Sequence, residues 1–167
     1  MSSSHDVNQR DFGNPNFEER GQALVDFLRD GIPLARSMDL RLDRYDGERL
    51  VFAAPLPPNV NDKGCAFGGS LVSAMTLCGW GLVELALRGR GEDCDVFVGD
   101  SQVRYLAPVW EDFRAEAALA EDADWAAFFA DLDSRGKARI DIACMVPGNE
   151  GQPAATLLAR FVAKRRT

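Results

Sequence analysis

Gly68, Gly69 and Ser70 form a short run that can bind an oxygen atom carrying negative charge. Two glycines let the backbone approach a ligand closely. A helix that starts here leaves N–H groups unpaired at the positive end of its dipole, where they stabilise the oxyanion that develops when a carbonyl group reacts. Asn61, in the preceding loop, can donate from its side-chain NH2 to the same oxygen or orient a water. The alternative is that Asn61 only caps a turn and that the glycines only begin the helix.

Thr76 is the second candidate for chemistry. It follows Gly69 by seven residues, about 700° of helical rotation, so the two residues share a face to within about 20°. Its hydroxyl can bind a ligand or, more simply, the backbone of its own helix. No Asp or Glu occurs between residues 64 and 83, so this helix has no carboxylate that could act as a general base for water.

Two carboxylates lie close to this segment in the sequence. Asp62 is beside Asn61 and is the alternative base for a hydrolytic reaction, but we expect it to point to solvent and to pair with Lys63. Glu84 lies two turns beyond Thr76, and we expect it to be solvated or ion-paired at the helix end.

Aromatic and thiol side chains offer further possibilities. Phe67, Trp80 and Tyr105 can line a substrate pocket, but we expect each to serve mainly in core packing. The only histidine is His5, in the N-terminal tail, so no cysteine has an imidazole partner and we interpret the thiols as small apolar fillers. Their spacing matches no zinc motif and requires no disulfide framework, so we expect no metal site and no cofactor. The cysteines are Cys65, Cys78, Cys94 and Cys144.

The elements that must position these residues follow from hydrophobic periodicity and turn signals. Residues 64–83 carry no charge and match the length of a membrane span, but their glycines and hydroxyl residues favour a buried central helix instead. The expected order is an amphipathic helix over 17–29, strands over 38–45 and 50–56, the buried helix over 70–87, strands over 95–107 and 113–119, a short helix or crossover over 123–132, and strands over 137–146 and 154–163. This order predicts an α+β fold in which an antiparallel sheet wraps around one long apolar helix.

Composition restricts the class of protein. The 167 residues, 46% of them hydrophobic and 27% charged, are typical of one globular domain. The net charge of −7 argues against non-specific nucleic-acid binding. The polar N-terminus has no apolar core of a signal peptide, so we expect a flexible arm over 1–16, a single domain over 17–167, and a cytoplasmic protein.

Two motifs resemble a known family. The segment NDKGCAFGG, residues 61–69, matches the N-x-x-G-x-x-[HF]-G-G pattern of hotdog-fold thioesterases. QVRYLAP, residues 102–108, is similar to the strand after the central helix of that fold. Residues 61–71, followed by GWGLV at 79–83, most resemble the YiiD C-terminal-domain family. The resemblance covers residues 20–164 and implies a single hotdog domain that acts on acyl thioesters.

The resemblance also implies a reaction. The family is described as thioesterases, and members as malonyl-ACP decarboxylases that supply acetyl-ACP for fatty-acid initiation. Many related thioesterases carry an acid where this chain has Thr76. Decarboxylation leaves an enolate, which needs oxyanion donors (the Gly69 N–H and Asn61) but no base, and an acid at position 76 would repel the malonyl carboxylate. We therefore favour decarboxylation, with a hydrolytic thioesterase and a non-catalytic acyl-thioester binding module as the alternatives. Phe67, Gly68, Ser70 and Trp80 are then the substrate-binding residues.

Partners follow from the same resemblance. It implies acyl-ACP or acyl-CoA as substrate, and a homodimer or dimer of dimers with sites between subunits and residues 95–107 as the pairing edge. An acidic carrier protein needs a local basic patch, although an ordinary solvated surface explains the same residues. The candidates are Arg88, Arg90, Arg104, Lys137, Arg139, Arg160 and residues 164–166.

Overall fold

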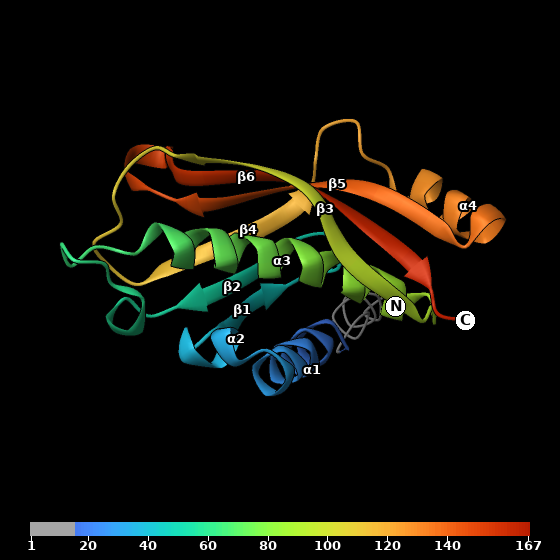
Figure 1. The fold of residues 1–167 in the computed structure, drawn as a ribbon, viewed down its shortest axis with the longest axis horizontal. Coiled ribbons are helices and arrows are strands. Elements are labelled where there is room, and N and C mark those ends of the chain that lie inside the picture. Colours follow the sequence, from blue (N-terminus) through green and yellow to red (C-terminus); the bar gives the residue numbers. More distant parts are fainter. Residues whose placement is uncertain (1–15) are drawn as a thin grey trace, which may run out of the picture.

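A computed structural model describes residues 16–167 as a sheet with helices on one side (Figure 1). The elements are α1 (Asn16–Gly31), α2 (Pro33–Ser37), β1 (Arg41–Tyr45), β2 (Leu50–Ala54), η1 (Pro57–Asn59), α3 (Gly68–Gly89), β3 (Cys94–Tyr105), β4 (Phe113–Leu119), α4 (Trp125–Arg135), β5 (Lys137–Pro147), η2 (Asn149–Gly151) and β6 (Pro153–Arg165). The predicted order of helices and strands is confirmed, with α2 as an addition.

The sheet is antiparallel and has six strands in the order β1-β2-β4-β5-β6-β3. Side chains alternate along each strand, so Phe113, Ala115 and Ala117 of β4 point into the core while Arg114 and Glu116 point away from it. We call the side that packs on α3 the inner face and the opposite side the outer face. Within residues 16–167, β3 pairs only with β6, so its twelve residues form one edge of the sheet.

Helix α3 lies along the inner face (Figure 1). It is long and apolar enough to cross a membrane, but 56% of its most apolar window is buried inside the fold, which confirms the prediction of a buried core helix. Two glycines let it approach the sheet closely. A methyl group at Gly79 would lie 3.0 Å from the Cys144 sulfur and from the Phe161 ring, and one at Gly81 would lie 3.0 Å from Leu50 of β2.

Two element ends differ from the expectation for local reasons. β1 begins at Arg41 rather than residue 38 because the chain turns at Asp39, whose φ is +54°. Arg41 and Arg29 hydrogen-bond the Asp39 carboxylate, and these bonds lower its pKa. The segment expected to be a short helix or crossover is helix α4, which Asp124 caps by accepting from the N–H groups of residues 126 and 127.

The expected division into an arm and one domain stays a prediction. Residues 1–15, including His5, lie outside the described part of the chain. Asn16, placed in the arm by the sequence, is the first residue of α1.

We expect Gly79→Ala to destabilise the fold. Alanine gains about 1 kcal/mol of helix propensity over glycine, but forcing a methyl group between α3 and the sheet costs about 1–3 kcal/mol, so the free energy of unfolding falls by about 1 kcal/mol. Urea denaturation at fixed protein concentration measures this. The matched control is Gly31→Ala, since nothing lies within 4 Å of a methyl group there; we expect no loss. Equal stabilisation by both changes would contradict close packing at Gly79.

Candidate active site

A tight hairpin of residues 60–66 leads into α3. Val60 and Ala66 form an antiparallel bridge, the Asn61 N–H donates to the Cys65 carbonyl at 2.8 Å, and the Ala66 N–H donates to the Val109 carbonyl at 2.7 Å. Gly64 turns the chain with φ of +89°, a backbone conformation that favours glycine. The hairpin thus holds Asn61 at its base, a few residues before the helix.

The Asn61 side chain caps this hairpin. Its Oδ1 accepts from the Lys63 N–H at 2.9 Å, and its Nδ2 donates to the Cys65 sulfur at 3.2 Å. Turn capping therefore accounts for the contacts that Asn61 makes within its own loop. Because thiol sulfur is a weak acceptor and the amide carries two hydrogens, Asn61 retains donor capacity for a ligand.

The first turn of α3 presents free donors. The N–H groups of Ser70 and Leu71 donate to the Phe67 carbonyl at 2.9 and 3.1 Å. Those of Gly68 and Gly69 have no partner in the described part of the chain. A side chain at Gly69 would overlap the Phe67 ring, so only glycine permits this ring position. The first turn of α3 therefore offers two backbone donors, on Gly68 and Gly69, whereas the Ser70 N–H is already bound; that this run binds an oxyanion stays a prediction.

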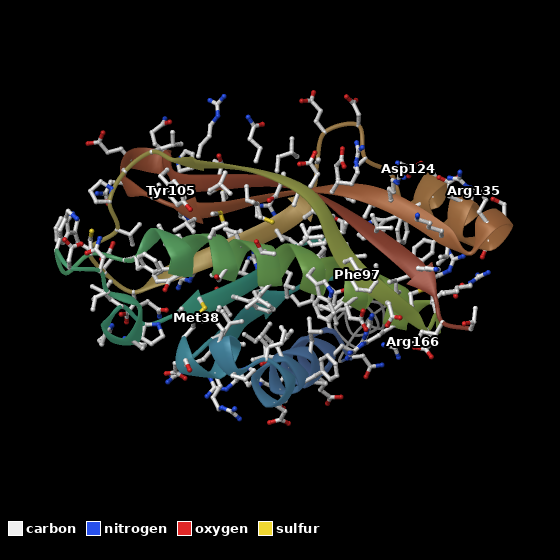
Figure 2. The ribbon with its side chains drawn as sticks, viewed as in Figure 1. Met38, Phe97, Tyr105, Asp124, Arg135 and Arg166 are labelled. Atoms are coloured by element: carbon white, nitrogen blue, oxygen red, sulfur yellow. The ribbon has the colours of Figure 1, made fainter. Side chains whose placement is uncertain are left out.

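Two aromatic side chains frame this turn instead of filling the core. Phe67 is 55% exposed and Tyr105 is 57% exposed, so the prediction of core packing is wrong for both. The Tyr105 hydroxyl donates to the Gly68 carbonyl at 3.3 Å, and Figure 2 shows Tyr105 at the end of β3 that lies beside the start of α3. Tyr105 sits on an edge strand, where the inner face is open to solvent.

Thr76 and Trp80 lie further along α3 and are both half-buried. The Trp80 indole N–H donates to the Val96 carbonyl at 2.9 Å, so Trp80 ties α3 to β3 and packs against the core as expected. The Thr76 hydroxyl makes no hydrogen bond within residues 16–167, which leaves it available to a ligand. Thr76 does share a helix face with Gly69, but seven residues separate them by about 10 Å along the axis. One small acyl group cannot touch both residues of the same helix.

The nearby carboxylates are placed as the sequence predicted. The Asp62 side chain is 80% exposed and pairs with Lys63 at 2.9 Å. Glu84 pairs with Arg88 at 2.9 Å. Neither carboxylate contacts the first turn of α3.

Asn59 is a site residue that sequence reasoning missed. It is buried, and its Nδ2 donates to the carbonyls of Met38 and Pro55 at 3.0 and 2.8 Å. The main-chain carbonyl of Asn59 accepts from the Phe67 N–H at 2.7 Å. Asn59 therefore ties the start of α3 to the turn before β1. An Asn after two prolines is typical of an exposed turn, so no local pattern indicates its burial.

Most cations considered for carrier binding are already paired. Arg90 stacks on the Phe129 ring at 4.2 Å. The ion pairs are Arg88 with Glu84, Arg160 with Asp141, Arg165 with Glu92 and Asp133, and Arg166 with Asp93 and Asp95. Ion pairing, or for Arg90 ring stacking, thus explains these residues without a carrier.

The cysteines are all buried free thiols. Burial raises the pKa of Cys144 to about 12 and the pKa of Cys78 well above its usual value. Because the thiolate is the reactive form, neither side chain is suited to nucleophilic catalysis. Among residues 16–167, no group of three or more His, Cys, Asp or Glu side chains could hold a metal ion.

Comparison with known proteins agrees with this geometry. A family model described as "Putative thioesterase (yiiD_Cterm)" matches residues 21–165. A solved protein of unknown function from Chlorobaculum tepidum TLS is 30% identical with a TM-score of 0.83, over 89% of this chain and 96% of that one. A "putative thioesterase" from Shewanella oneidensis is 27% identical with a TM-score of 0.78, over 88% and 99%. A thioesterase from Haemophilus influenzae, 14% identical with a TM-score of 0.65 over 85% and 88%, shares the fold. The predicted hotdog architecture is confirmed.

We expect Cys78 and Cys144 to resist alkylation in the native protein. Because their pKa values are raised, both thiols stay protonated at about pH 8. Because both side chains are buried, iodoacetamide cannot reach them. Peptide mass spectrometry after a timed reaction measures the label at each cysteine, and the same reaction in guanidinium chloride gives the full extent. Rapid native labelling of either residue would show that it is accessible and reactive.

Proposed function

The chain belongs to the YiiD C-terminal family of thioesterase-like proteins, and from this premise we propose that it decarboxylates a malonyl thioester to an acetyl thioester. The thioester is carried by acyl carrier protein or CoA in the cytoplasm, for fatty-acid initiation. The observation that supports the proposal is that the N–H groups of Gly68 and Gly69 have no partner within residues 16–167 and lie in a segment without a carboxylate from residue 64 to residue 83.

The reaction requires little from the protein beyond binding and charge stabilisation. When the malonyl carboxylate leaves as CO2, its bonding electrons form an enolate whose oxygen becomes negative. The Gly68 and Gly69 N–H groups and the helix dipole favour that charge, and Asn61 adds a donor from the hairpin. The exposed Phe67 ring, which covers Gly69, excludes water from one side of the reacting carbonyl. A proton from water then adds to the α-carbon of the enolate and gives the acetyl thioester.

Thr76 completes the site only from a second copy of the chain. Its distance of about 10 Å from Gly69 along one helix exceeds the size of a malonyl group. We therefore place the Thr76 hydroxyl of one protomer near the Gly68–Gly69 turn of its partner, where it hydrogen-bonds the malonyl carboxylate without repelling it. An acid in this place would favour hydrolysis, since it could activate water.

The β3 edge is the surface through which the two copies pair. A twelve-residue edge strand presents unpaired backbone groups that a second strand can bind. Val98 and Tyr105 point to the inner face of β3 and are 47% and 57% exposed in the single chain. Pairing of two β3 strands covers these side chains and brings the two α3 helices next to each other.

The test is mass spectrometry of the protein incubated with malonyl-ACP, malonyl-CoA and a panel of acyl-CoAs. Loss of one CO2 with the thioester intact is the expected result. Release of free carrier thiol from several substrates would replace decarboxylation with hydrolysis, for which Asp62 is the nearest base. Retention of substrates without turnover would indicate a binding module.

Three variants assign the residue roles. We expect Asn61→Ala to lower decarboxylation by about 10²–10³-fold, the effect of removing one oxyanion donor. Thr76→Val keeps the shape but loses the bond to the carboxylate, so we expect a loss of about tenfold. Asp62→Asn is the control and retains activity because the proposed reaction needs no base. If Asp62→Asn loses activity while Thr76→Val keeps the activity of the wild-type protein, hydrolysis is favoured.

Val98→Lys tests the dimer. A lysine pointing inward on an edge strand disfavours strand pairing, so we expect a shift from dimer to monomer in light scattering, with loss of activity. Leu34→Lys, at a residue 51% exposed on α2, is the matched control and leaves the dimer intact. A monomeric wild-type protein with full activity would overturn the shared site.

A further inference from the structure

The outer face of the sheet carries a groove that the proposed reaction does not use. Its volume is about 490 Å³, within the range of small-molecule sites. The groove crosses β4, β5, β6 and β3, and Ala118, Ala143, Met145 and Leu158 form its apolar floor.

The register explains the hollow. Ala118, Ala143, Leu158 and Gln102 lie opposite one another on successive strands and form one cross-strand row. The two alanines sit side by side, so longer side chains in the neighbouring rows rise above them. Leu158 is 48% exposed on this floor. An exposed leucine contributes no burial free energy to a solvated sheet face. An aliphatic ligand that covers it does gain this free energy, because apolar surface is removed from water.

The two ends of the groove differ in charge. At the β3 end, Arg104 lies opposite Thr156 and two residues from Gln102, and it forms no ion pair within residues 16–167. At the other end, both Arg49 and Glu116 line the groove, so charges of opposite sign are present there. The β3 end is therefore the one with an uncompensated cation and neutral hydrogen-bonding groups beside it.

The outer face of the sheet also carries more positive than negative unpaired charges. Outward positions of the strands hold five cations without an ion pair in the described chain, against two such carboxylates, Asp100 and Glu116, although the protein has a net charge of −7. The cations are Arg44, Arg104, Lys137, Arg139 and Lys164. The outward carboxylate of Asp141 is bound to Arg160. A second copy packed back to back on this face would bring like charges together, so an anionic ligand fits the surface better.

We propose that this groove binds an unbranched aliphatic carboxylate, a free fatty acid of medium length. The carboxylate lies against Arg104, Gln102 and Thr156, and the chain crosses Leu158 and Ala143 toward Ala118. From β3 to β4 the distance is three strand spacings, about 14 Å, which an extended chain of about ten to twelve carbons covers. This site is separate from the start of α3 and does not depend on the proposed reaction.

The experiment is an NMR titration of the full chain with sodium dodecanoate, followed through backbone amide and methyl signals. We expect saturable shifts at residues 102–104, 143 and 158. Dodecanol and dodecyltrimethylammonium serve as the neutral and cationic probes, and both should bind at least about tenfold more weakly, since a charge-assisted bond at Arg104 is absent.

Two variants locate the site. Arg104→Gln removes the cation and should weaken dodecanoate binding about tenfold, and Ala143→Phe fills the floor and should abolish it. Lys164→Gln is the matched control, because it removes one cation from the same face outside the groove. Three outcomes would overturn the proposal. They are chemical-shift changes confined to residues 68–80, equal dodecanoate affinity in Arg104→Gln and Lys164→Gln, and the absence of saturable binding. Repeating the titration with Asn61→Ala separates binding in the groove from the proposed decarboxylation, because a variant that lacks the activity should still bind dodecanoate.

Discussion

The close contact between α3 and the sheet is the constraint on which the rest of the structure depends. Gly79 and Gly81 bring the helix backbone against Phe161, Cys144 and Leu50, and interiors packed this tightly do not deform smoothly. Because the helix is fixed against β2, β5 and β6 at its middle, its first turn is fixed in space as well. The donors at Gly68 and Gly69 are thus held by contacts made two to three turns away.

The loop before α3 adds a second restraint on the same turn. Asn59 binds the carbonyls of Met38 and Pro55 and receives the Phe67 N–H, while Tyr105 reaches the Gly68 carbonyl from β3. The start of the helix is therefore tied to the β1 side of the sheet and to its β3 edge. Backbone donors positioned from two sides need no reorganisation when charge develops on a substrate oxygen, which is the condition for electrostatic stabilisation.

Patterns among neighbouring residues in the sequence predicted most of the helices and strands. The uncharged run predicted the buried helix, and alternation with turn residues predicted the strands, because these signals depend on near neighbours. Phe67 and Tyr105 were misassigned to the core because their exposure depends on β3 being the sheet edge, which sequence periodicity does not specify. The burial of Asn59 and the alanine floor of the outer groove depend on contacts and register between distant segments. Spacing placed Thr76 on the correct helix face but gave no account of its separation from Gly69 along the axis.

Strand β3 joins the two faces of the protein. Successive side chains of a strand point to opposite sides, so Arg104 faces the outer groove while Tyr105 faces the first turn of α3. One peptide unit thus separates a cation on the outer face from a hydroxyl that contacts Gly68. Any force on the end of β3, from a ligand on one face or a paired strand at the edge, acts on both residues. The same geometry that leaves β3 open for pairing therefore makes its last residues the shortest physical connection between the outer face and the proposed reaction site.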